Sequence, residues 1–369
     1  MKYSGLILLV HFCFFSILIG ANFQYAGNVT KTSIDKNVVQ VQLENGTAEI
    51  QLITDEIVRI RFYPAASIPE EFSYAVLPLK IDVKITQISD TEKNLEISTP
   101  KILIKVKKNP LRIGFYDHQG TLISRDHDSF GMGWNGTKIY CWKELHDDEP
   151  FYGLGEKTRG LNKRGNAFTM WNSDIPAYST TQDPLYQSHP FFLSIHNGIS
   201  FAYFLDNSYR TFFNFGAGNN QFYYFGADDG VLDYYFIYGE DPKAVLENYG
   251  RLVGTMPLPP KWGLGYQQCR WSYYPDTEVL SLAKKFRDKQ IPCDVIYLDI
   301  HYMDGYRVFT WHPERFSQPK STVSQLSEMG FKTAVIIDPG IKVDPDYWVY
   351  QQGISGDYFC RYQDGTFYQ

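Results

Sequence analysis

The sequence of 369 residues is poor in cysteine and has no long run of charges of one sign. Only five cysteines are spread over the chain, and none has the spacing of a metal-ligand pair, which argues against a disulfide framework and a cysteine-bound metal centre. Lys and Arg total 35 against 41 Asp and Glu, a formal net charge of −6, and no basic stripe stands out. Nucleic acid is therefore not an expected partner.

Long hydrophobic runs are also missing, apart from one near the N-terminus. The segment from Leu6 to Ile19 is almost wholly apolar, Lys2 precedes it, and the small residues Gly20 and Ala21 follow it. The pattern is typical of a secretory signal peptide over residues 1–21, because the apolar run is short for a membrane span. We therefore expect an exported protein (extracellular, periplasmic or in the lumen of the secretory pathway) without a stable membrane anchor. An uncleaved N-terminal anchor is the alternative.

Aromatic residues are abundant by contrast. The chain holds 28 Tyr, 26 Phe and 7 Trp, and aromatics make up 17% of it. Aromatic side chains suit the half-buried, pleated surface of β-sheets, so this composition favours a β-rich fold. It also fits a surface on which flat sugar rings stack, and composition does not decide between the two.

The first region after the N-terminal segment, residues 22–255, consists of short alternating or apolar runs separated by turn residues. Val39–Leu43 and Ile57–Phe62 are examples of such runs. Many short strands at this spacing predict an antiparallel β-sandwich. One helix is expected near its end, at Asp241–Tyr249, where Asp241 can cap the helix and a proline occupies its first position.

The second region, residues 256–369, begins with the proline-rich connector Met256–Lys261. Beyond it the chain alternates strand, helix, strand, helix, strand. The expected elements are Trp262–Cys269, Asp276–Lys289, Asp294–Ile300, Ser321–Met329 and Lys332–Asp338. Such alternation with apolar strands predicts a parallel sheet that is covered on both sides.

Aromatic and acidic residues follow each of these strands. Parallel strands of a (β/α)₈ barrel carry the active site at their carboxyl ends. The segments in question are Arg270–Tyr274, Asp299–Asp304 and Asp338–Ile341. An aromatic ring packs on the C–H face of a pyranose and a carboxylate accepts bonds from its hydroxyls, so the pattern suits a sugar. The alternative is structural: tryptophan often lies in the core, and an aspartate after a strand often caps the next helix.

Six segments, in order and at matching distances, resemble glycoside hydrolase family 31. They are Phe151–Glu156, Trp171–Asp174, Ser188–Phe191, Pro259–Trp271, Leu298–Asp304 and Ile337–Ile341. The resemblance implies a galactose-mutarotase-like β-sandwich followed by a (β/α)₈ barrel, of which this chain would hold the first three strands. It also implies a retaining, exo-acting α-glycosidase that acts on oligosaccharides and needs no metal or organic cofactor.

The resemblance also implies which residues bind the substrate. Asp174 matches an aspartate in a loop of the sandwich that touches the sugar, and Trp271 matches the aromatic wall of the subsite. Asp299 matches the carboxylate that holds sugar hydroxyls, and Ile300 and Ile341 match apolar residues of the pocket. Core packing is an open alternative for the two isoleucines.

The catalytic residues of the family have no counterpart in this sequence. The nucleophile lies in a Trp-x-Asp-Met-Asn-Glu type segment after the fourth barrel strand, and the acid/base lies later, so both are expected beyond Gln369. Glycosidic cleavage needs two carboxyl groups, and spacing alone would nominate Asp299 with Asp304 or Asp338. The resemblance argues against that nomination, and no catalytic residue is assigned.

We therefore expect the N-terminal part of an enzyme that hydrolyses terminal non-reducing α-glucosidic bonds, inactive as this chain alone. A non-catalytic carbohydrate-binding protein is the alternative from another class. An α-xylosidase or a transglycosylase of the same family is the alternative within the enzyme class.

Overall fold

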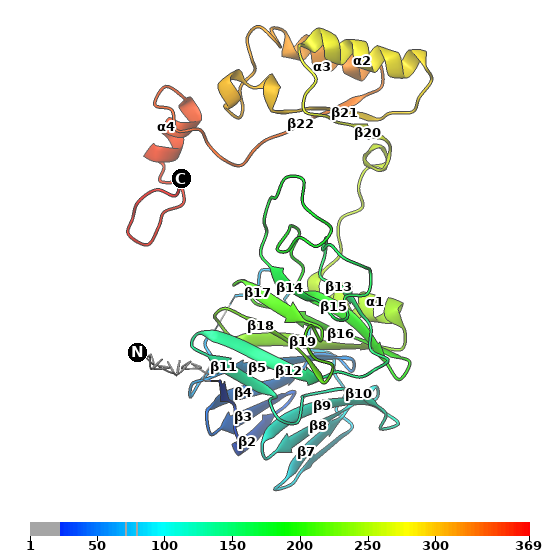
Figure 1. Cartoon of the computed structure of the whole chain (residues 1–369), viewed down its shortest axis with the longest axis vertical. Coiled ribbons are helices and arrows are strands. Elements are labelled where there is room, and N and C mark those ends of the chain that lie inside the picture. The colour runs from blue at the N-terminus through cyan, green and yellow to red at the C-terminus, as the bar shows by residue number, and fades with distance from the viewer. Residues whose placement is uncertain (1–22, 71, 79) are drawn as a thin grey trace, which may run out of the picture. The chain divides into compact units, whose positions relative to one another are not determined.

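The computed structural model describes residues 23–70, 72–78 and 80–369, and the predicted signal peptide at residues 1–21 lies outside them. The chain divides into two compact units, one ending at Thr255 and the other comprising Met256–Gln369 (Figure 1). Each unit has its own hydrophobic core.

The first unit is built from three antiparallel sheets. The eight-stranded sheet has the order β13 (Phe151–Gly153), β15 (Phe191–His196), β16 (Ile199–Leu205), β19 (Leu232–Gly239), β5 (Ile57–Tyr63), β4 (Gly46–Leu52), β3 (Val38–Leu43) and β2 (Val29–Asp35). The six-stranded sheet has the order β1 (Gln24–Tyr25), β11 (Met132–Asn135), β12 (Lys138–Glu144), β18 (Phe222–Ala227), β17 (Thr211–Asn214) and β14 (Ala167–Met170). The five-stranded sheet has the order β10 (Leu122–Arg125), β9 (Leu111–Asp117), β8 (Ile102–Lys108), β7 (Asn94–Ser98) and β6 (Gln87–Asp90).

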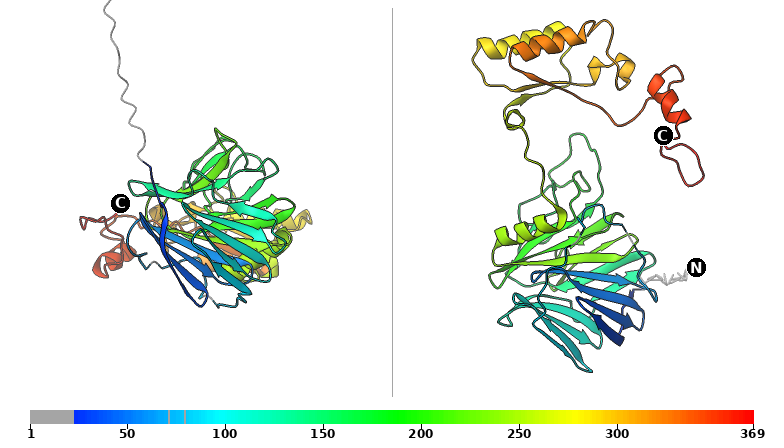
Figure 2. Two further views of the ribbon diagram at one scale, coloured as in Figure 1. Left: turned by 90° about the horizontal axis from the view of Figure 1, so that it is seen from below. Right: turned by 180° about the vertical axis from the view of Figure 1, so that it is seen from behind.

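The sheets pack into a sandwich, as Figure 2 shows from two further sides. Phe236 of the eight-stranded sheet stacks on Phe115 of the five-stranded sheet, with ring centroids 3.9 Å apart. On the same face Tyr203 meets Phe225 of the six-stranded sheet at 5.5 Å. The two smaller sheets therefore form the second layer together. The predicted antiparallel β-sandwich is confirmed, and much of the aromatic content lies in its core.

One helix covers the other face of the eight-stranded sheet. Helix α1 spans Pro242–Val253, and its N-cap Asp241 accepts a hydrogen bond from the Ala244 N–H, as the sequence predicts. Val245 and Leu252 of the helix are buried in a small cluster with strand residues such as Ile237. The cap satisfies a backbone donor, and the apolar face fixes the helix on the sheet.

A fully buried ion pair lies inside the sandwich. Lys143 Nζ donates to Asp126 Oδ1 at 2.7 Å and to the Tyr234 hydroxyl at 3.3 Å, and neither charged side chain is exposed. Burial on its own would lower the pKa of Lys143, but the Asp126 carboxylate reverses the effect and holds that pKa well above its ordinary value. Removing one partner of such a pair leaves the other charge buried and uncompensated.

We predict that Lys143→Met destabilises the protein by roughly 3–5 kcal/mol in equilibrium urea unfolding. The matched control is Lys138→Met on the same strand, because the Lys138 ammonium meets Asp228 at 3.0 Å on the surface. Its expected cost is below about 1 kcal/mol. Equal losses in the two variants would contradict the assigned role of the buried pair.

A second buried ionisable group is Glu149. The His146 backbone N–H donates to Glu149 Oε2 at 3.1 Å, and the side chain has almost no contact with solvent. Burial raises the pKa of Glu149 from 4.5 to about 8. The folded state therefore keeps a proton that the unfolded chain releases, so this group costs stability as the pH rises from about 4.5 to about 8.

We predict that the difference in unfolding free energy between Glu149→Gln and the unchanged protein grows with pH across this window. The expected gain of the variant is about 1.4 kcal/mol for each pH unit, and it levels off above the folded pKa. Urea unfolding at a series of pH values measures the difference. A difference that stays constant from acid to alkaline pH would show that Glu149 is not held protonated.

The second unit contains a parallel sheet of three strands, β20 (Gln267–Gln268), β21 (Val295–Leu298) and β22 (Lys332–Val335). Its helices are α2 (Asp276–Asp288), α3 (Pro319–Glu328) and α4 (Trp348–Ser355), with short 3₁₀ helices η1 (Lys261–Leu264), η2 (Ile300–Tyr302) and η3 (Asp304–Tyr306). The predicted start of a (β/α)₈ barrel is confirmed: three strands with intervening helices, and no closed barrel. No helix of the described residues has the length and apolar character needed to cross a membrane.

Two details of the second unit differ from the sequence prediction. The strand expected at Trp262–Cys269 is reduced to Gln267–Gln268, because its first half turns into η1, where the Gly263 N–H bonds to the Pro260 carbonyl at 2.8 Å. Gly265 then passes so close to Asp294 that a Cβ would lie 1.8 Å from Oδ2. Helix α4 was not predicted from the sequence.

Candidate substrate-binding site

The parallel sheet brings three chain segments to one edge. Gln268 pairs with Ile296, and Leu298 pairs with Val335, so the carboxyl ends of the three strands are in register. The residues that follow these strands are therefore neighbours, although they are far apart in the sequence. This is the edge at which the sequence predicts a sugar site.

Aromatic rings cluster around His301 at this edge. The Trp271 ring, which is 74% exposed, lies 5.9 Å from the His301 ring between centroids. The Tyr274 ring stacks on His301 at 4.9 Å with an interplanar angle of 10°. His301 Nδ1 is buried and makes no hydrogen bond to any residue that the structure describes. Trp271 thus presents a ring to solvent beside a histidine with an unused ring nitrogen.

Asp299 is held at the end of β21 by the helix that follows it. Its Oδ1 accepts a hydrogen bond from the Ile300 N–H at 2.6 Å, which caps η2. Among the described residues nothing donates to Oδ2, so this oxygen is left as an acceptor. Burial raises the pKa of the Cys269 thiol, and the charge of Asp299 adds to the rise. Trp271 follows β20 and Asp299 follows β21, so both residues lie at the carboxyl edge of the sheet.

The two isoleucines lie at the boundary between this surface and the core. Ile300 and Ile341 are half-buried and both pack against the cluster that contains Tyr302, Met303 and Tyr347. Core packing is thus part of their role. Their predicted contact with a sugar is not tested by the structure and stays a prediction.

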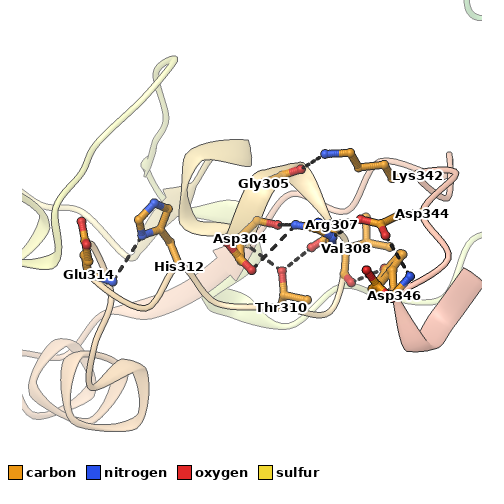
Figure 3. A network of polar contacts seen from close by, with 11 residues as sticks. Asp304, Gly305, Arg307, Val308, Thr310, His312, Glu314, Lys342, Asp344 and Asp346 are labelled. Atoms are coloured by element: carbon orange, nitrogen blue, oxygen red, sulfur yellow. Dashed lines mark hydrogen bonds and ion pairs between the residues drawn. The ribbon is translucent and has the colours of Figure 1, made fainter.

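A polar network joins the loop after β21 to the loop after β22 (Figure 3). The guanidinium of Arg307 donates to Asp344 Oδ2 from Nε at 2.9 Å, and Lys342 Nζ donates to the Gly305 carbonyl at 2.9 Å. Asp304 lies 3.8 Å from Arg307 across the same network. The Arg307 guanidinium also holds the pKa of Asp344 below its usual range. These contacts fix the segment that carries Ile341 against the segment that carries Asp299.

Asp174 lies in the first unit, in the exposed loop between β14 and β15. The loop is pinned at its base, where the Ser188 N–H donates to Asn172 Oδ1 at 3.0 Å. This bond joins two of the segments that carry the family resemblance. The other four predicted residues lie in the second unit, which the structure describes separately, so the predicted approach of Asp174 to them stays a prediction.

Two features of this site were not predicted from the sequence. They are the contacts of the His301 ring with the Trp271 and Tyr274 rings and the bond between Arg307 and Asp344. An isolated histidine in the sequence gives no signal, because its stacking on Tyr274 requires the segment after β20 and η2 to be brought together by tertiary packing. No group of three or more His, Cys, Asp or Glu side chains within the described ranges could hold a metal ion.

We predict that Arg307→Leu and Asp344→Leu loosen the same pair of loops by similar factors. Hydrogen exchange of the amides between residues 336 and 346 is expected to accelerate in each variant. Because the two side chains bond to each other, the acceleration in the double variant should be smaller than the two single effects combined. Additive acceleration in the double variant would show that the two residues do not act together.

Comparison with known proteins agrees with this architecture. Residues 47–214 match the glycosyl hydrolase 31 N-terminal galactose mutarotase-like domain, and residues 256–369 match the glycosyl hydrolases family 31 TIM-barrel domain. Alpha-glucosidase 2 of Bacillus thermoamyloliquefaciens is 41% identical over 346 residues, which make up 93% of this chain and 43% of that protein. An alpha-glucosidase of Saccharolobus solfataricus is 35% identical over 233 residues, or 63% of this chain and 33% of that protein.

A solved structure gives the same result. It is a mutant of the GH31 dextranase of Flavobacterium johnsoniae complexed with isomaltotriose, which superimposes with a TM-score of 0.83 at 36% sequence identity. The match covers 91% of this chain and 41% of the dextranase chain. The chain thus spans less than half the length of the relatives that it matches.

Proposed function

The chain belongs to glycoside hydrolase family 31, and we propose that it forms the sugar-holding part of a retaining α-glucosidase. The whole enzyme would hydrolyse terminal non-reducing α-glucosidic bonds in oligosaccharides. The observation that carries the proposal is that the fixed Asp299 carboxylate and the exposed Trp271 ring both follow strands at the carboxyl edge of the parallel sheet. Relatives named alpha-glucosidase, at 41% and 35% identity, support it.

The different roles of Trp271 and Asp299 follow from the chemistry of a pyranose. One face of the ring carries C–H groups that pack on an aromatic surface such as Trp271. The hydroxyls at its edge donate to a carboxylate, and Asp299 keeps Oδ2 as an acceptor while the Ile300 N–H fixes Oδ1. A site that pairs hydroxyls in this way discriminates against sugars that leave a polar group unpaired, at a cost of about 1–3 kcal/mol for each one.

The bond-breaking pair is proposed to come from elsewhere in the enzyme. Cleavage with retention needs two carboxyl groups about 5–5.5 Å apart. Asp304 faces Arg307 in the network between the loops, and Asp299 caps η2, so each already has a structural role. We therefore propose that the 369-residue chain holds a sugar without cleaving it.

We predict no turnover of p-nitrophenyl α-glucoside by the purified 369-residue chain, together with measurable binding of isomaltotriose in saturation-transfer NMR. Asp299→Asn should weaken binding about tenfold, since it turns one acceptor oxygen into a donor. The matched control is Asp288→Asn, because Asp288 is an exposed carboxylate on α2 whose hydrogen bonds within the described ranges come from Lys284. Turnover by the chain would refute its inactivity, and unchanged binding in Asp299→Asn would refute the site.

One observation favours isomaltotriose-type sugars over maltose-type sugars as the substrate class. The dextranase that resembles this chain at 36% identity was solved with isomaltotriose rather than with a maltose-type sugar. Comparing the binding of isomaltotriose with that of maltotriose in the same experiment ranks the two linkages. Tighter binding of a xyloside than of either glucan would favour the α-xylosidase alternative.

A further inference from the structure

The outer face of the six-stranded sheet carries a hollow that the proposed function does not use. In an antiparallel sandwich the solvent face of a sheet is commonly polar, yet here it carries large aromatic side chains from three neighbouring strands. A cavity of about 320 Å³ opens among them. This volume is on the scale of a single sugar ring with its hydroxyls.

The register of the strands explains why the hollow exists. Tyr140 pairs with Gly226, Gly226 pairs with Phe212, and Phe212 pairs with Thr169, so these four residues form one row across β12, β18, β17 and β14. Gly226 supplies no side chain, and the Phe212 ring reaches over it, so that a Cβ there would lie 2.8 Å from the ring. The next row ends in Ala167, which is exposed and small. The small side chain of Ala167 thus leaves a space beside these large neighbours.

Three rings line this space. The Tyr140 and Phe212 centroids are 5.0 Å apart, and Tyr224 lies 6.2 Å from each of them. All three side chains are half-buried, so part of each ring remains open to a ligand. Such a group of packed rings is rigid, which reduces the entropy that a ligand would have to offset on binding.

Polar atoms stand at the rim of the hollow. Asp183 Oδ2 accepts from the Thr169 N–H at 2.7 Å, whereas the buried Oδ1 makes no hydrogen bond to any residue in the described part of the chain. Lys157 Nζ lies 4.0 Å from this oxygen, too far for a hydrogen bond. The Tyr224 hydroxyl lies 3.3 Å from Asn214 Nδ2, from which it accepts, and keeps its own proton for another acceptor. The hollow therefore offers a hydroxyl donor above an apolar floor, whereas Asp183 is engaged by Thr169 and Lys157.

We propose that this hollow binds one pyranose unit of a neutral oligosaccharide, as a second carbohydrate site that does not depend on Asp299. The C–H face of the sugar packs on Phe212 and Tyr140, and the Tyr224 hydroxyl, which keeps its own proton, donates to an oxygen of the sugar.

The test uses the full chain in the Asp299→Asn background, which weakens sugar binding at the parallel sheet. Isothermal titration and saturation-transfer NMR with isomaltotriose and with maltotriose measure the binding that remains. We expect residual binding, and we expect Ala167→Phe to reduce it at least tenfold, because the new ring fills the hollow without removing a contact that holds the fold. Ala167→Ser is the conservative variant and should bind as before.

A second pair of variants tests whether the loss of binding comes from the hollow itself. Phe212→Leu removes part of the floor of the hollow and should also weaken the residual binding. Phe222→Leu on the same sheet face should not weaken it, because Phe222 does not line the hollow. Urea unfolding confirms that each variant is folded. Absence of residual binding in the Asp299→Asn chain, or equal binding by Ala167→Phe, would overturn the proposal. If Asp299→Asn has no effect while Ala167→Phe abolishes binding, the proposed function fails and this second site stands.

Discussion

The proposed sugar site depends on the parallel pairing of three short strands in the second unit. Strand β21 is the centre of this pairing, and Val295, Ile296 and Leu298 are fully buried in it. Burial on both faces holds this strand at the centre of the sheet, and its pairings with β20 and β22 set the register. The register in turn decides that the segments containing Trp271 and Asp299 leave the sheet at the same edge. The sugar-holding surface is a consequence of that constraint.

The aromatic residues of the first unit lie both in its core and on an outward face. Their abundance in the sequence was consistent with a β-rich core and with a surface on which sugars stack. Phe115 and Phe236 stack in the core, where they join two sheets. Tyr140 and Phe212 belong to the same unit but face outward, on alternate positions of their strands. The period-2 geometry of a strand sends neighbouring residues to opposite faces, so both uses are built from adjacent positions.

Local rules predicted some elements well and others not at all. The start of α1 at Asp241 and Pro242 follows from capping chemistry that acts within four residues, and the structure has it. The strand predicted at Trp262–Cys269 is wrong in its first half, which forms a 3₁₀ turn. This turn and the close contact of Gly265 with Asp294 depend on another part of the chain. The candidate site residues came from the family resemblance rather than from periodicity. The stacking of Tyr274 on His301 could not be predicted, since it requires two loops to be placed by tertiary packing.

The most direct measurement of the central claim is an experimental structure of the chain with isomaltotriose bound. The account predicts a pyranose ring whose C–H face lies against the Trp271 indole and whose hydroxyls donate to Asp299 Oδ2. Isomaltotriose bound elsewhere in the second unit, with Trp271 and Asp299 free of sugar, would contradict it.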